Sequence, residues 1–210
     1  ADGLSALEKK QAEADDTGRV WVDPTTASQW IYRRLEESRV PIYCAQTPLA
    51  KWKAQKNETE LEGFRQAHLK DGLAMVRFSR WLEDAVAAGR QSELSIVAQL
   101  EELRCAQPGY RGPSFATICG YEDHGAIVHY AVDEASNRPV EPRGILLVDS
   151  GGQYDEGTTD ITRTFCLGTP APVHTRAYTA VLQGHLALLR ALFPARTDGY
   201  QLDVLARAPL

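Results

Sequence analysis

The sequence predicts a mixed fold of helices and strands, of the α/β (α+β) class. Apolar residues recur at helical spacing over three long segments, residues 57–88, 92–107 and 174–193. Between the second and the third, alternating apolar and polar residues predict strands. The chain has 210 residues, 43% of them apolar, which is enough for a sizeable core in one or two domains.

Charge and hydropathy exclude several classes of partner. The net charge is −5, with both signs interspersed and no basic stripe, so we expect no nucleic-acid partner. We also expect no membrane partner, because no apolar run approaches the length of a membrane span and the N-terminus lacks a signal-peptide pattern. The four cysteines are widely spaced and form no C-x-x-C pair. A reducing compartment is the simpler interpretation, and we expect a cytoplasmic protein.

The first quarter of the chain predicts helix, strand, helix and strand, at residues 4–14, 19–23, 24–37 and 40–43. Trp30, Ile31 and Leu35 are the expected buried stripe of the second helix. Such short elements are too few for an independent sheet. Residues 46–57 carry a proline and no clear period, which is typical of a linker. We therefore expect residues 1–56 to be the end of one domain plus a linker.

Two helices follow, and both are expected to be scaffold. Asn57 and Glu60 form a capping-box pattern at the start of the first, and Gly89 is suited to its end. His68 in this helix is expected to be a partly buried packing residue and not a ligand. Ser92 starts the second helix.

From Pro113 the pattern predicts strands. Residues 114–120 and 125–130 are expected to form two strands joined by a turn that contains a solvent-exposed His124. His129 falls on the second strand, where a histidine is usually structural. After residue 165 a long helix is predicted over 174–193, and a short one over 201–207. The inward stripe of the long helix is expected to comprise Tyr178, Val181, Leu182, His185, Leu188, Leu189 and Leu192.

Two carboxylates lie in the segment 144–165, which predicts a β-ribbon closed near Tyr154. Asp149 ends an apolar run, and Asp160 begins a β-branched run eleven residues later. If the two are directly opposed, their Cβ atoms are roughly 4.5–5.5 Å apart. Like charges that close repel unless one is protonated or a cation lies between them. Two metal ions about 3.5–4 Å apart would fit. The alternative is a pair of unrelated aspartates, one in a turn and one on a solvated face.

The amino-acid sequence that flanks these two carboxylates favours the metal site. Residues 148–154 (VDSGGQY) and 157–164 (GTTDITRT) closely resemble the metal-site ribbon of cytosolic aminopeptidase P, the Xaa-Pro aminopeptidase. That enzyme is one of the pita-bread metallopeptidases, with methionine aminopeptidase, prolidase and creatinase. The resemblance implies that residues 57–210 are the first half of a pita-bread catalytic domain. Residues 1–56 would close a creatinase-like α/β middle domain.

The resemblance also implies a mechanism. Two divalent metal ions, manganese with zinc or cobalt as alternatives, would support hydrolysis that releases the N-terminal residue of peptides with proline second. Asp149 would chelate one ion and Asp160 would bridge both. His129, in the segment 125–130 (GAIVHY), would face the substrate.

The remaining ligands, a histidine and two glutamates, would come from a second half that follows Leu210. The chain would then be a fragment that is inactive alone, with the missing C-terminal half as its partner. A homodimer is expected for the full-length protein.

Two other functions remain open. Prolidase has the same fold and cuts Xaa-Pro dipeptides. A non-catalytic pita-bread module would bind peptides or proteins, but such members have lost metal ligands, whereas both carboxylates are present here.

Overall fold

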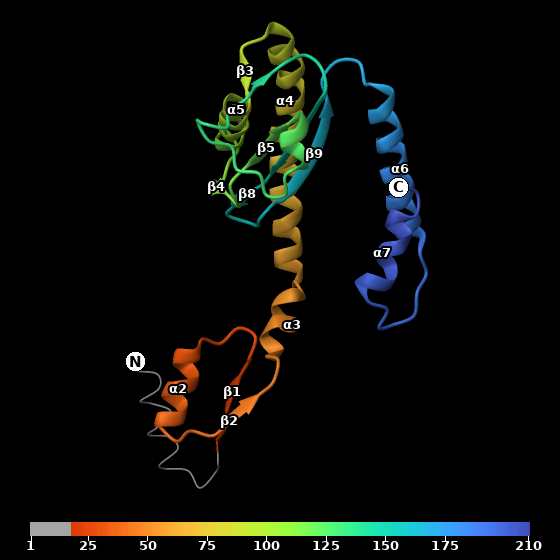
Figure 1. The fold of residues 1–210 in the computed structure, drawn as a ribbon. Coiled ribbons are helices and arrows are strands. Elements are labelled where there is room, and N and C mark those ends of the chain that lie inside the picture. Colours follow the sequence, from red (N-terminus) through yellow and green to blue (C-terminus); the bar gives the residue numbers. More distant parts are fainter. Residues whose placement is uncertain (1–17) are drawn as a thin grey trace. The chain divides into compact units, whose positions relative to one another are not determined.

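The computed structural model describes residues 18–210 and divides the chain into two compact units, one that reaches residue 61 and one that covers residues 62–210 (Figure 1). The helix predicted over residues 4–14 lies outside the described residues.

In the first unit, two short parallel strands pair with each other, and a helix lies between them in the sequence. β1 (Val20–Val22) pairs with β2 (Ile42–Cys44), and α2 (Gln29–Glu37) connects them. Both predicted strands are confirmed within a residue or two of their bounds. The small core comprises Val22, Leu35 and Val40.

The second helix begins five residues later than predicted. Asp23 Oδ1 accepts hydrogen bonds from the backbone N–H (3.0 Å) and the hydroxyl (2.7 Å) of Thr25, which holds the chain in a turn before the helix starts. Trp30 was expected to be buried and is 61% exposed, so that prediction is wrong. Leu35 is buried, and Ile31 packs against the small core.

The expected linker is partly helical. α3 (Pro48–Ala54) begins with Pro48 at its first position, and the Thr47 hydroxyl accepts a hydrogen bond from the Leu49 N–H. A proline is tolerated there because the first N–H of a helix has no partner inside the helix. The capping residues Thr47 and Pro48 are visible in the sequence, but a helix was not predicted because the short segment shows no apolar periodicity.

Two helices form the scaffold of the second unit. α4 (Glu58–Ala88) starts with the predicted reciprocal bonds between Asn57 and Glu60, both 2.9 Å, and is followed by Gly89 at φ +78°. α5 (Glu93–Cys105) starts with a capping box between Ser92 and Ser95. Both predicted helices are confirmed. His68 is exposed and contacts its own helix through the Phe64 carbonyl, so it does not pack in the core.

A three-stranded antiparallel sheet of order β5-β7-β9 packs on these helices (Figure 1). Its strands are β5 (Ile118–Tyr121), β7 (Ile145–Ser150) and β9 (Ile161–Cys166). Two smaller antiparallel pairs adjoin it: β4 (Tyr110–Pro113) with β8 (Gly152–Tyr154), and β3 (Gln91–Ser92) with β6 (Pro139–Val140). One core joins sheet and helices, and its fully buried members include Phe78, Leu82, Ile96, Leu100, Leu146 and Val148.

The strand predicted over residues 125–130 is not formed. A 3₁₀ turn, η1 (Glu122–Ala126), follows β5, and the chain then continues without regular structure to β6. The backbones of Gly120 and Gly125 approach so closely that a Cβ on Gly120 would lie 2.7 Å from the Gly125 nitrogen. Chain reversal at this contact takes the place of a second strand.

The C-terminal helices form as predicted, but the apolar stripe of the longer one is not buried. α6 (Pro172–Arg190) and α7 (Gly199–Arg207) pack together where Gly184 meets the carbonyl of Ala206. Gly184 is the sole buried residue of α6. The exposed apolar side chains of α6 and the following turn are Val173, Tyr178, Val181, Leu182, Leu186, Leu188, Leu189, Leu192 and Phe193. In the described part of the chain, no helix has the length and apolar character needed to cross a bilayer.

Candidate metal and substrate site

Asp149 lies on the face of the sheet that is turned away from the helices. Along β7, Leu146, Val148 and Ser150 are buried against the helical layer, while Asp149 alternates to the other face and is half-buried. The Thr162 hydroxyl on β9 donates a 2.7 Å hydrogen bond to Asp149 Oδ1. One carboxylate oxygen is therefore held in place by the neighbouring strand.

Asp160 lies on the same face but is not directly opposite Asp149. The register pairs Asp149 with Thr162 and Ser150 with Ile161, so the predicted opposition of the two aspartates is wrong by two residues. Thr159 and Ile161 point into the core, which sends Asp160 to the outer face with Thr162. Asp160 directly precedes β9, so it lies at the end of the ladder and diagonally across from Asp149.

The reason for the register lies in the connection between the strands. In the sequence β8 lies between β7 and β9, but it pairs with β4 in a separate sheet. Tyr154 and Gly157 then close a turn by exchanging backbone hydrogen bonds. Gly151 permits this path, because a Cβ there would lie 2.0 Å from the Thr159 carbonyl oxygen. The turn was predicted near Tyr154, but the close approach at Gly151 was not.

A buried ion pair holds the chain next to Asp160. The carboxylate of Asp71 on α4 accepts bonds from Arg104 Nε (2.6 Å) and Nη2 (3.1 Å), and both side chains are at most 1% exposed. The same carboxylate accepts hydrogen bonds from the hydroxyls of Tyr154 (3.0 Å) and Thr159 (2.7 Å). Thr159 directly precedes Asp160, so this cluster fixes the backbone from which Asp160 projects.

Burial opposes ionisation of Asp71, but hydrogen bonds from Arg104, Thr159 and Tyr154 outweigh it and keep the pKa of this carboxyl below its ordinary value of 3.8. Sequence reasoning missed this cluster. An aspartate in the middle of a long helix resembles any solvated helix position, and its partners lie 33 to 88 residues away.

Asp71→Asn should lower the free energy of unfolding by about 3–5 kcal/mol, because it leaves Arg104 buried without a counter-charge. The matched control is Asp84→Asn on the same helix, whose pair with Arg80 is exposed and should cost no more than about 0.5 kcal/mol. Urea unfolding measures both. A loss for Asp71→Asn no larger than the control's would contradict the structure.

The lowered pKa of Asp71 also predicts how the free energy of unfolding depends on pH. A carboxyl with a lowered pKa in the folded state contributes stability above the pKa of the unfolded state, and that contribution is lost as the pH falls through the folded-state pKa. The difference in unfolding free energy between wild type and Asp71→Asn should therefore be full near pH 7 and shrink below pH 3.8. A difference that does not change between pH 7 and pH 3 would be inconsistent with this account.

His129 lies on the irregular segment after η1, is exposed, and has a left-handed backbone with φ +54°. The expectation that His124 is solvent-exposed is wrong. Its side chain is only 14% exposed, and its Nδ1 lies 2.9 Å from a carboxylate oxygen of the fully buried Glu93. Sequence reasoning saw Glu93 only as a first-turn residue of a helix.

The donor set suits part of a metal centre. Asp149 and Asp160 supply hard anionic oxygens on one face, and Asp160 makes no side-chain hydrogen bond within residues 18–210. Across those residues, histidine, cysteine, aspartate and glutamate side chains form no group of three that could hold an ion. The two aspartates therefore fit as part of a ligand set.

Comparison with known proteins defines the class. Residues 62–210 match metallopeptidase family M24, and the chain belongs to this family. The chain is 37% identical to aminopeptidase P1 of Arabidopsis thaliana over 98% of its own length and 35% of that protein. It is 46% identical to a probable Xaa-Pro aminopeptidase P of Laccaria bicolor over 78% of its own length and 26% of that protein.

Solved structures agree. An X-prolyl aminopeptidase from Caenorhabditis elegans, described as a cytosolic enzyme with a di-nuclear active site, matches with a TM-score of 0.82 and 31% identity, over 99% of this chain and 34% of that one. A Xaa-Pro dipeptidase from Bacillus anthracis matches with a TM-score of 0.76 at 20% identity, a likeness of fold alone. The chain spans about a third of the length of its curated relatives. The predicted pita-bread fold and the resemblance to aminopeptidase P are confirmed.

Proposed function

We propose that the complete polypeptide containing this chain is a metal-dependent Xaa-Pro aminopeptidase that releases the N-terminal residue from peptides with proline second. The observation that carries the proposal is the pair of carboxylates, Asp149 and Asp160, on one open face of a sheet in an M24 chain. Relatives named aminopeptidase P support the substrate class.

Asp149 and Asp160 are proposed to hold two divalent ions, with Asp149 as the ligand of one and Asp160 shared by both. Bound divalent ions would supply Lewis-acid activation of water and of the peptide carbonyl. Oxygen donors favour manganese, with zinc or cobalt as alternatives if imidazole completes the set. The diagonal placement supports two ions, since it leaves more room between the two side chains than direct opposition would.

This chain's residues would orient the reactants. Thr162 fixes one oxygen of Asp149, and the Asp71 cluster fixes the approach to Asp160. His129 would donate a hydrogen bond to the substrate peptide near the scissile bond. Its exposure supports this role, because a side chain free of core contacts can reach a ligand.

The rest of the complete polypeptide is also part of the proposal. A second catalytic half would supply a histidine and two glutamates as further ligands. Residues 1–56 would close a middle domain, with residues 57–210 as the first catalytic half. We further propose a cytoplasmic homodimer. The cytosolic description of the nematode neighbour and four free cysteines are consistent with that location.

The substrate class is tested by comparing Xaa-Pro dipeptides with longer peptides that begin Xaa-Pro. An aminopeptidase should cleave the longer peptides efficiently. A preparation that cleaves dipeptides and leaves longer peptides intact would be a prolidase, and one that binds peptides without cleaving them would be a non-catalytic module.

His129→Ala should lower turnover of an Xaa-Pro peptide by about 10²-fold with metal content unchanged, as expected for loss of a group that stabilises the transition state. His68→Ala is the matched control, since His68 is also exposed and its ring contacts Phe64 of the same helix. Steady-state kinetics and elemental analysis of the full-length variants make the comparison. Loss of metal in parallel with activity would show that His129 is not a substrate-facing residue.

A further inference from the structure

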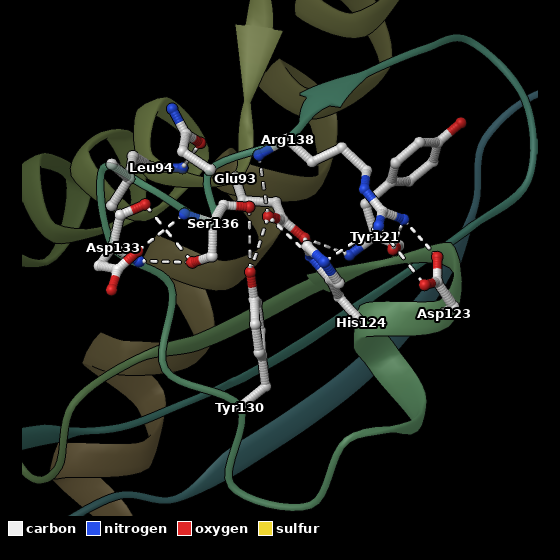
Figure 2. A network of polar contacts seen from close by, with 10 residues as sticks. Glu93, Leu94, Tyr121, Asp123, His124, Tyr130, Asp133, Ser136 and Arg138 are labelled. Carbon is white, nitrogen blue, oxygen red and sulfur yellow. Dashed lines mark hydrogen bonds and ion pairs between the residues drawn. The ribbon is translucent and has the colours of Figure 1, made fainter.

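Glu93 accepts hydrogen bonds from residues that lie before and after His129 in the sequence (Figure 2). Its side chain is fully buried at the start of α5. One oxygen accepts bonds from the backbone N–H of Tyr121 (2.8 Å) and from His124 (2.9 Å). The other accepts bonds from the Tyr130 hydroxyl (3.2 Å) and the backbone N–H of Arg138 (3.1 Å).

The partners of His124 indicate which tautomer a neutral ring would adopt. Arg138 Nη2 lies 3.0 Å from His124 Nε2, and a guanidinium can only donate. His124 Nε2 therefore accepts, so the proton of a neutral imidazole is on Nδ1 and points at Glu93. Asp123 pairs with the same guanidinium on its outer side (Figure 2). Glu93 therefore accepts hydrogen bonds from His124, Tyr130 and two backbone N–H groups, and no side of the carboxylate lacks a donor.

The residues that make these contacts lie on both sides of His129 in the sequence. Tyr130 is its immediate neighbour, and the rings of Tyr130 and His124 pack with centroids 4.5 Å apart. On the other side, the Ile127 N–H donates to the His124 carbonyl (3.1 Å), and the Tyr130 N–H donates to the Ile127 carbonyl (3.2 Å). The segment 124–130 is thus a short closed turn, both ends of which are bound to one buried carboxylate.

Such anchoring has an energetic reason. His129 holds φ at +54°, a conformation that costs a non-glycine residue of order 1 kcal/mol and persists only where the surroundings impose it. Within residues 18–210 its exposed side chain makes no hydrogen bond that could impose it. The hydrogen bonds on either side do, because a buried carboxylate binds its donors more strongly than a neutral acceptor would.

We propose that Glu93 is a positioning residue for His129 and acts through Tyr130 and His124. This inference rests on the proposed function, in which His129 contacts the substrate. It adds that the orientation of His129 is set by the first turn of α5, where Glu93 lies, and not by the metal ligands.

Tyr130→Phe tests the inference with little disturbance, because it removes one hydroxyl and keeps the ring against His124. We expect kcat for an Xaa-Pro peptide to fall about 10-fold in the full-length protein, with metal content unchanged, since a small misplacement of a substrate contact is costly. Tyr110→Phe is the matched control. It also removes a part-buried tyrosine hydroxyl from a carboxylate, Glu101 at 2.7 Å, but in a different part of the fold. Its kcat should stay within about twofold of wild type.

A double-mutant cycle then separates positioning from general loss of structure. In a His129→Ala background, Tyr130→Phe should change kcat by less than about twofold, because the residue through which it acts is gone. An undiminished effect of Tyr130→Phe in that background would overturn the inference, and so would equal effects of Tyr130→Phe and Tyr110→Phe. If His129→Ala lowers turnover but Tyr130→Phe does not, only the positioning role fails. If His129→Ala has wild-type turnover, the proposed role of His129 fails first, and the inference with it.

Discussion

Asp149→Asn or Asp160→Asn in the complete polypeptide should abolish hydrolysis of Xaa-Pro peptides and lower bound metal. Loss of residues that merely orient ligands costs about 10–100-fold, so loss of a ligand itself should exceed about 100-fold. An amide is a poor replacement for an anionic oxygen donor. Peptidase assays and elemental analysis of the purified variants measure both effects.

The structure makes Asp149→Asn a clean test of charge. The amide oxygen of asparagine can still accept the Thr162 hydrogen bond, so the strand pairing should survive. Melting temperatures should stay close to wild type. Asp203→Asn, on an exposed helix pair with Arg207, is the control and should keep full activity. Near-normal turnover of Asp160→Asn with a full metal complement would end the two-metal proposal.

Residues 1–210 alone should show no peptidase activity and should self-associate. Catalysis should be absent because the two aspartates are the only ligands we propose within the chain. Association should follow from the exposed apolar side chains of α6 and of the turn after it, where Leu189 is 69% and Leu192 is 100% exposed. Contiguous patches of this kind mark surfaces that bind another protein or aggregate. Light scattering after size-exclusion chromatography measures the mass of the species.

The same surface offers a variant test. Leu189→Lys should reduce self-association without lowering the melting temperature, because the side chain is mostly exposed. Leu100→Lys, at a fully buried position of α5, should instead prevent folding. Denaturing mass spectrometry of any active preparation should reveal a second, C-terminal polypeptide. A monomeric 210-residue chain that cleaves Xaa-Pro peptides on its own would refute the proposal that a second half is needed.

Local signals predicted much of the fold. The Asn57–Glu60 pair, the Ser92 cap and Gly89 bounded the two scaffold helices to within a few residues, because helix ends are set by nearby hydrogen bonds. The alternating run 145–150 was also correct, since one face of that strand is buried.

Long-range packing decided what the sequence could not. The register of β7 and β9 depends on the path through Gly151, and residue spacing alone does not encode that path. His124 was expected in solvent because its partner, Glu93, lies 31 residues earlier. The stripe on α6 was recognised as apolar, but periodicity does not tell which surface covers it. The sequence of one ribbon predicted Asp149 and Asp160 as metal ligands, which stays a prediction, whereas it did not predict that Asp71 and Arg104 hold this ribbon in place.

The most direct measurement is the anomalous scattering of manganese in crystals of the full-length protein soaked with Mn²⁺. We expect two peaks about 3.5–4 Å apart on the outer face of the β7–β9 ladder. Oxygens of both Asp149 and Asp160 should lie within coordination distance, and His129 should lie beside the ions without binding them. Peaks remote from both aspartates, or a single ion bound by neither, would contradict it.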